Sequence, residues 1–162
     1  IVPASIDESV KKAELPRLHA LRLASEKARA VAATQQGFLL AADTVVAVGR
    51  RILPKAETDQ TVRDCLKLLS GRRHQVITAV ALIVPGGKLR SRVVQTRVSF
   101  ARLTQSQIDA YVDCREGVGK AGGYAIQGRA EIFVRGISGS YSNVVGLPLL
   151  ETVSLLAGSG FH

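Results

Sequence analysis

The sequence predicts an α/β domain, and three patterns lead to this expectation. Residues 38–48 form a run of eleven residues of which nine are apolar, as in a buried strand. Residues 16–36 gather apolar side chains on one helical face, and residues 89–100 alternate between apolar and polar as a half-buried strand does. Helices thus alternate with strands and hairpins along the chain, which favours a mixed sheet flanked by helices.

The length of 162 residues and the hydrophobic content of 46% are typical of one globular domain, which we expect to span residues 1–162. No stretch approaches about eighteen uninterrupted apolar residues, so we expect no membrane-spanning helix and no membrane partner. Cys65 and Cys114 are too few for a disulfide framework and lack the spacing of metal ligands. They favour reduced thiols and a cytoplasmic location, with a Cys65–Cys114 bridge as the alternative.

The first expected helix begins at Pro16 and ends near Gln36, because proline suits the first helical position and Gly37 stops the pattern. Its apolar face is formed by Ala20, Leu21, Leu23, Ala24, Ala28, Ala30, Val31 and Ala32. Lys27 falls inside this face, where an ammonium group is costly unless the side chain reaches solvent or meets an anion. His19 lies on the polar face, where we expect it to be solvated.

After the strand at residues 38–48, a turn at residues 49–51 leads into a short strand at residues 52–53. Pro54 disfavours helix before it, so Lys55 stands on a bend. The elements expected after this bend are a helix at residues 57–70, two antiparallel strands at residues 75–84 and 89–100, a helix from a Thr104–Gln107 capping box to about Val112, a strand at residues 131–135, a polar loop at residues 138–143 and a last helix from Pro148 to Gly158. Apolar periodicity and terminal Gly or Pro residues set these bounds.

The stretch at residues 119–128 carries four glycines and one lysine, Lys120. Glycine lacks a Cβ, so backbone N–H groups there could approach a phosphate. The stretch matches neither a P-loop nor a dinucleotide fingerprint, and an ordinary turn is the alternative interpretation.

Asp43 lies in the middle of the strand at residues 38–48. An ionised carboxylate there must be paired, become protonated or face a polar cavity; the alternative is a strand-end Asp that accepts hydrogen bonds from backbone N–H groups. The other polar candidates are Glu8, Lys27, Thr44, Lys55, Lys120 and Gln127. The sequence offers no Ser-His-Asp or Cys-His set and no cluster of His and Cys. A carboxylate with several lysines suits a Mg²⁺-dependent reaction at a polyphosphate.

The net charge of +9, from 22 Lys and Arg against 13 Asp and Glu, favours an anionic partner such as a nucleotide, a nucleic acid or an anionic lipid. The basic residues are scattered, and three Tyr, four Phe and no Trp offer little for stacking single-stranded bases. We therefore favour a nucleotide over a nucleic acid as the partner.

Several motifs in one order then span nearly the whole chain: Ala42-Asp43-Thr44-Val45-Val46, Lys55, Leu69-Ser70-Gly71 with His74, Val76-Ile77-Thr78, Lys120-Ala121-Gly122, Ile126-Gln127-Gly128 and the run from Gly139 to Leu149. With these motifs the sequence resembles the Maf (septum formation inhibitor) family of nucleoside triphosphate pyrophosphatases. The resemblance implies two α/β lobes around a cleft, similar to inosine triphosphate pyrophosphatases, and a homodimer. It also implies hydrolysis between the α and β phosphates.

The resemblance further implies that Asp43 is the general base, and that Glu8, Lys27 and Lys55 line a phosphate site with a divalent cation, Mg²⁺ or Mn²⁺, at Glu8 and Asp43. Thr44 and Gln127 would help select the base, and Lys120 and Tyr124 belong to the same matching loop. That loop looks like the dTTP/UTP-type members, since members acting on 7-methyl-GTP lack its lysine and its Ile-Gln-Gly.

The family opens with a Ser-Ala-Ser-Pro-Arg-Arg segment, which this sequence lacks, and the sequence contains no Met. We therefore expect that an N-terminal segment is missing. Two alternative functions stay open: a nucleotide- or nucleic-acid-binding regulator of cell division and septum formation, and the same hydrolysis of modified nucleotides. Tight, salt-sensitive DNA binding would favour the regulator.

Overall fold

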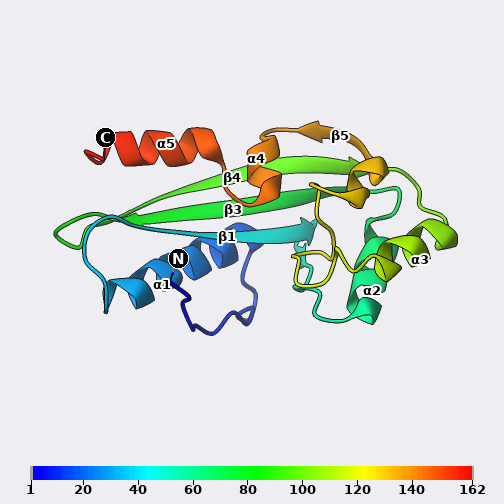
Figure 1. Cartoon of the computed structure of the whole chain (residues 1–162), viewed down its shortest axis with the longest axis horizontal. Helices are drawn as coiled ribbons and strands as arrows, with labels where there is room; N and C mark the ends of the chain where they lie inside the picture. The colour runs from blue at the N-terminus through cyan, green and yellow to red at the C-terminus, as the bar shows by residue number, and fades with distance from the viewer. Residues whose placement is uncertain (1, 162) are drawn as a thin grey trace.

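The structure, a computed structural model, describes residues 2–161 and is built on a five-stranded sheet (Figure 1). The strands are β1 (Leu39–Val48), β2 (Arg51–Ile52), β3 (Arg73–Ile83), β4 (Leu89–Phe100) and β5 (Val134–Ser138), in the order β2-β1-β3-β4-β5. The helices are α1 (Pro16–Ala32), α2 (Asp59–Leu69), α3 (Gln105–Asp113), the 3₁₀ helix η1 (Arg129–Phe133), α4 (Tyr141–Val145) and α5 (Leu149–Ala157). The predicted α/β class is confirmed, while the two-lobed arrangement stays a prediction.

All four strand pairs are antiparallel, where we expected a mixed sheet. The reason lies in the connection between β1 and β3. A parallel pair would need a crossover that runs back along a face of the sheet. Here β2 turns back beside the end of β1, and α2 lies with α3 beyond the same end of the sheet (Figure 1). The chain therefore enters β3 from that end and runs antiparallel to β1.

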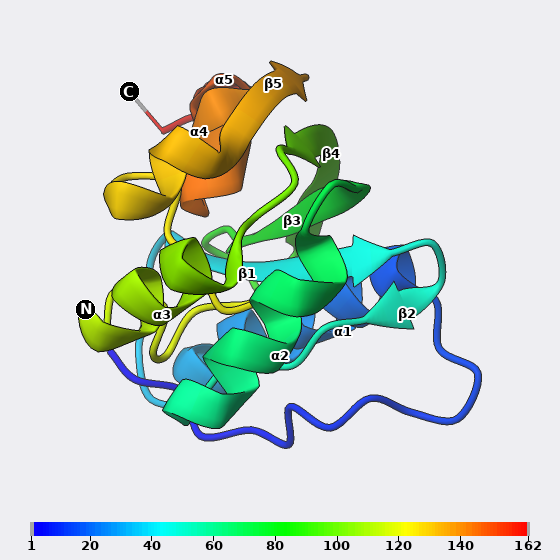
Figure 2. The same ribbon diagram turned by 90° about the vertical axis from the view of Figure 1, so that its right-hand side faces the viewer.

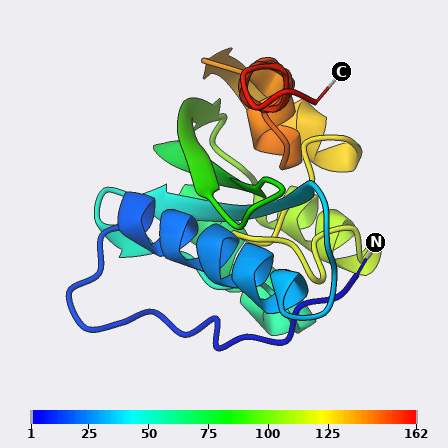
Figure 3. The ribbon, with the colours of Figure 1, turned by 90° about the vertical axis from the view of Figure 1, so that its left-hand side faces the viewer.

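Helix α1 covers one face of the sheet, and α4 and α5 lie on the other (Figures 2 and 3). Ala20, Ala24 and Ala28 of α1 are fully buried against the sheet. Because these side chains are small, the helix lies close to β1 and β3. On the opposite face, Leu155 of α5 packs against Val80 and Leu82 of β3. A larger apolar cluster joins α2, α3 and the glycine-rich loop to the end of the sheet.

Three expected elements differ from the structure. Helix α1 ends at Ala32, because residues 33–36 are exposed and bury no apolar side chain. The strand expected at residues 131–135 begins only at Val134, because residues 129–133 form η1. The spacing of three brings Ala130 and Phe133 together into the core and leaves Ile132 75% exposed. The polar loop expected before Pro148 contains α4.

The structure also bears on membrane-spanning helices and on the state of the two cysteines. No helix among residues 2–161 is long and apolar enough to cross a membrane. Cys65 and Cys114 are both free thiols, so the alternative of a bridge between them is wrong.

Candidate active site

The outer edge of β1 is largely open, and this opening creates the site. Strand β2 pairs only with Ala47 and Val48, so in the described part of the chain the rest of β1 has no strand on this side. A cleft of about 670 Å³ lies along the open edge. The cleft is lined by every residue that the sequence indicated for the site, namely Glu8, Lys27, Asp43, Thr44, Lys55, Lys120, Gln127 and Tyr124.

Lys27 and Asp43 form the centre of the cleft's charged half. Lys27 Nζ lies 2.6 Å from Asp43 Oδ1 and 2.7 Å from Glu8 Oε1. Asp43 is therefore paired and faces a polar cavity, and the alternative of backbone capping at a strand end is wrong. Lys27 meets anions rather than only reaching out to solvent.

Burial and hydrogen bonding shift the pKa values of Asp43, Lys27 and Glu8. The side chain of Asp43 is only 10% exposed, and its desolvation raises the pKa of the carboxyl although the Lys27 ammonium offsets part of the effect. Burial alone would lower the pKa of Lys27, but its hydrogen bonds to Asp43 and Glu8 outweigh burial and raise it. The hydrogen bond from Lys27 lowers the pKa of Glu8. A basic carboxylate thus lies beside a cation that stays charged, an arrangement that can accept a proton next to an anionic substrate.

The same two carboxylates can be tested as ligands of a divalent cation. Asp43 and Glu8 converge on one ammonium, so their oxygens lie close together. No group of three or more His, Cys, Asp or Glu side chains with the geometry of a metal site occurs among residues 2–161. Two carboxylates without a full protein cage suit Mg²⁺, which usually keeps waters and substrate phosphates as its other ligands. The donor set therefore fits the expected cation.

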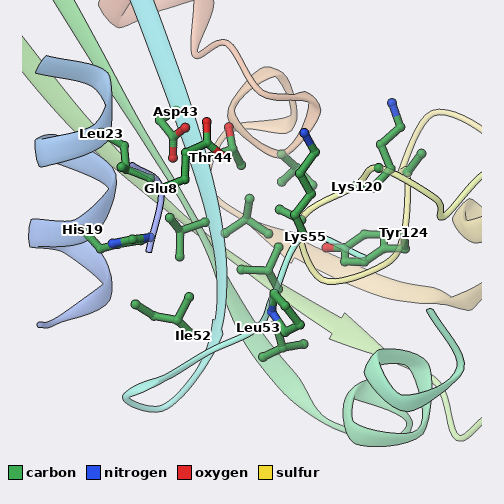
Figure 4. A pocket seen from close by; sticks show the side chains of 18 of the residues that line it. Glu8, His19, Leu23, Asp43, Thr44, Ile52, Leu53, Lys55, Lys120 and Tyr124 are labelled. Atoms are coloured by element: carbon green, nitrogen blue, oxygen red, sulfur yellow. The ribbon is translucent and has the colours of Figure 1, made fainter. Parts of the chain in front are cut away.

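Lys55 and Lys120 lie on one side of β1, whereas His19 and Glu8 lie on its other side (Figure 4). The glycine-rich loop holds them in place by pairing with the chain around Ala56. Ala56 donates its N–H to Lys120 O at 3.0 Å and accepts from Gly119 N–H at 2.7 Å. Both lysines are exposed, so their ammonium groups are free to meet an anion in the cleft.

The glycines of this loop serve packing as well as access. A Cβ at Gly122 would meet Val46 Cβ at 2.8 Å, and one at Gly123 would meet Val62 Cα at 3.1 Å. The loop lies this close to the sheet end and α2 because these positions have no side chain. The interpretation of the glycines as a phosphate-binding backbone stays a prediction.

The cleft continues past β1 into a less charged half. Successive residues of a strand point to opposite faces, so Thr44 faces away from Lys27 while Asp43 faces toward it. The hydroxyl of Thr44 lies 2.9 Å from that of Thr78, its partner on β3. The apolar side chains that line this half are Val46, Val76, Ile126, Val144 and Val145. Such a surface suits the two faces of a flat ring, with the Thr44 hydroxyl available to a polar group on its edge.

Tyr124 also lines the cleft and is held by His74. The Tyr124 hydroxyl lies 2.7 Å from His74 Nε2, and His74 is only 1% exposed. The sequence marked His74 as part of a motif but gave it no partner, because the two residues are far apart along the chain.

A second group that the sequence missed supports the loop carrying Glu8. Arg22 donates to Glu14 through Nε at 2.7 Å and to Ser9 O through Nη2 at 2.8 Å. His19 is buried, not solvated as expected, and its Nδ1 lies 2.8 Å from Glu14 Oε2. The hydrogen bonds from Arg22 lower the pKa of Glu14 to about 2. These contacts connect α1 to an irregular segment, which no sequence periodicity could indicate.

Comparison with known proteins finds relatives that match nearly the whole chain. The family model described as Maf-like protein matches residues 1–159. A protein of Caulobacter vibrioides is 59% identical over 161 residues, which is 99% of this chain and 83% of the relative. Proteins of Mesorhizobium japonicum and Paramagnetospirillum magneticum are each 58% identical, covering 99% and 98% of this chain and 81% and 84% of the relatives. All three relatives are named dTTP/UTP pyrophosphatase.

Proposed function

The chain belongs to the Maf family, and we propose from its relatives and its cleft that it hydrolyses dTTP and UTP to the nucleoside monophosphate and pyrophosphate. The observation that carries this proposal is the pairing of Asp43 with Lys27 in a cleft whose other half is largely apolar. Phosphates suit the charged half, and a pyrimidine ring suits the apolar half.

Asp43 acts as the general base in this proposal. Its Oδ1 is held by Lys27, which orients the carboxylate and leaves the second oxygen to accept a proton from water. The water oxygen then bonds to phosphorus and the anhydride bond between the α and β phosphates breaks. Lys55 and Lys120 compensate the negative charge that gathers on the departing pyrophosphate.

Glu8 and Asp43 would hold the divalent cation, Mg²⁺ or Mn²⁺. When bound, the cation would compensate phosphate charge as a Lewis acid. Thr44 and Gln127 contact the base in this assignment; both line the cleft, and Thr44 faces away from Lys27.

Two further properties belong to the same proposal. The free thiols of Cys65 and Cys114 are in keeping with a reducing, cytoplasmic location. A homodimer is supported by large apolar side chains that α4 and α5 leave exposed outside the cleft: Tyr141, Leu149, Leu150 and Val153. Several large apolar side chains exposed on neighbouring helices are typical of a protein interface.

The test measures pyrophosphate release from UTP, dTTP, CTP and the purine triphosphates, with Mg²⁺, with Mn²⁺ and with EDTA. We expect release from UTP and dTTP that needs the cation. Asp43→Asn should lower kcat by about 10² to 10⁴, the usual contribution of a general base, while leaving the folded state intact. Asp64→Asn is the matched control, because Asp64 is exposed and, among residues 2–161, its side chain is hydrogen-bonded only to Gln60.

No release from any triphosphate would contradict the enzymatic proposal and favour a binding regulator. Full activity in Asp43→Asn would remove Asp43 from the role of base.

A further inference from the structure

A chain of buried hydrogen bonds fixes the direction in which the Thr44 hydroxyl points its proton. Thr78 Oγ1 lies 3.0 Å from the main-chain oxygen of Asn143 and 2.9 Å from Thr44 Oγ1. A carbonyl oxygen can only accept a hydrogen bond, so the Thr78 hydroxyl must donate its single proton to the Asn143 carbonyl. The bond between the two hydroxyls then requires Thr44 to donate and Thr78 to accept.

The far end of this chain cannot reorient. Thr78 and Asn143 are both 0% exposed. The Asn143 side chain donates through Nδ2 to Val76 O and to Thr96 Oγ1, each at 3.0 Å. The Asn143 carbonyl also accepts from Gly146 N–H at 3.1 Å. The acceptor that directs Thr78 is therefore held by both strands under α4.

With its proton committed to Thr78, the oxygen of Thr44 presents only lone pairs to the cleft. We propose that Thr78 is a specificity-determining positioning residue: it makes Thr44 a fixed acceptor, which selects a base with an N–H donor at ring position 3. This inference rests on the proposed function, because it assumes that the base lies at Thr44.

The selection follows from the chemistry of the pyrimidines. Uracil and thymine carry a proton on N3, which can donate to Thr44 Oγ1. Cytosine has a bare lone pair on N3, which would face the lone pairs of Thr44. A buried pair of acceptors leaves both groups unsatisfied, and we expect this to disfavour cytosine by about tenfold or more.

Removing the Thr78 hydroxyl should abolish this discrimination. In Thr78→Val the Thr44 hydroxyl has no internal acceptor and can turn its proton to the ligand, so it serves cytosine as well as uracil. The Asn143 carbonyl keeps its bond from Gly146, which limits the structural damage. Thr78→Ser keeps the hydroxyl and is the conservative control.

The experiment compares UTP with CTP by kcat/KM, and UMP with CMP by titration calorimetry. We expect the preference for uracil in both measurements to fall about tenfold in Thr78→Val and to be kept in Thr78→Ser. Thr44→Val should lose the same preference, and the double variant should lose no more than either single variant. Thermal unfolding of each variant separates this change in selectivity from a loss of folded protein.

An unchanged uracil preference in folded Thr78→Val would overturn the inference, as would equal binding of UMP and CMP to the original protein. Binding of neither monophosphate at millimolar concentration would also overturn it, since no base subsite would then exist. Because the monophosphates need no turnover, the binding test stands even if the protein hydrolyses none of the triphosphates and the proposed function fails.

Discussion

Arg22 donates a hydrogen bond of 2.8 Å from Nη2 to the main-chain oxygen of Ser9, the residue that follows Glu8. The same guanidinium is fixed by Glu14, with Nε 2.7 Å from Oε1 and Nη2 3.0 Å from Oε2. Residues 2–15 contain no helix or strand, so these bonds hold Glu8 near Lys27 in place of regular structure.

Arg22→Ala should therefore release the loop that carries Glu8. We expect kcat/KM to fall about tenfold or more, because small displacements of a positioning group are costly, with a higher cation concentration needed for half-maximal activity. Hydrogen exchange of the amides at residues 7–14 should become faster. Arg22→Lys should recover only part of the activity, since lysine cannot reproduce the fork of bonds.

The matched control is Arg29→Ala, on the exposed side of the same helix. Equal effects of the Arg22 and Arg29 substitutions would show that helix charge, and not the contact with the loop, causes the change.

Gly122→Ala should destabilise the protein more than Gly119→Ala. Both glycines have positive φ values, +67° and +79°, so backbone strain is common to the two substitutions. Only at Gly122 would the added methyl meet Val46, at 2.8 Å, while at Gly119 nothing lies within 4 Å. We expect an additional loss of about 1–3 kcal/mol in the free energy of unfolding, measured with urea. Equal losses at both positions would contradict the role of Gly122 in packing.

The proposed homodimer predicts that a charge on α5 separates the subunits. Leu150 is 76% exposed beside Leu149 and Val153, and Leu150→Glu would place a carboxylate in the interface. Sedimentation should then show a dimer for the original protein and a monomer for the variant. Ile132→Glu, at a residue 75% exposed outside α4 and α5, is the control and should remain dimeric. A dimer that survives Leu150→Glu would place the interface elsewhere.

The sequence predicted those parts of the fold that depend on local patterns. The bounds of β4 at residues 89–100 and the capping box at Thr104 agree with the structure, because alternation and capping are properties of neighbouring residues. Residues 131–135 misled the prediction, since the spacing of Ala130 and Phe133 has a meaning only against the core that they enter. The direction of β3 relative to β1 depended on where α2 packs, which the sequence of α2 does not contain.

The candidate site divides in the same way. An unusual position in a regular pattern revealed Asp43 and Lys27, because a charge inside an apolar run requires an explanation. Glu8, Lys55 and Gln127 lie in irregular segments, so the sequence marked them only as polar candidates, and the family resemblance gave them roles. Arg22 had no signal of its own. Thr78 and Asn143 belong to matching motifs, but the sequence gave them no role, since that role is defined by partners distant in the sequence.

His74 provides a prediction on pH. Its ring is 1% exposed, its Nδ1 has no hydrogen-bond partner in the described structure, and burial lowers the pKa of His74 from 6.5 to about 4. Between these values the unfolded chain binds a proton that the folded protein does not, so the free energy of unfolding falls as the pH falls from about 6.5 to about 4.

Above pH 6.5 the imidazole is neutral in both states and contributes no pH dependence, and below pH 4 it is charged in both. The loss should total about 3 kcal/mol, from the conversion of a pKa difference into free energy. His74→Gln keeps a side-chain donor near the Tyr124 hydroxyl but does not titrate. Urea unfolding at pH 7.5, 5.5 and 4.5 should therefore show a smaller loss of stability in His74→Gln than in the original protein. Parallel pH profiles for the two proteins would mean that His74 takes up its proton in the folded state, and that the acid sensitivity of the fold arises from other groups.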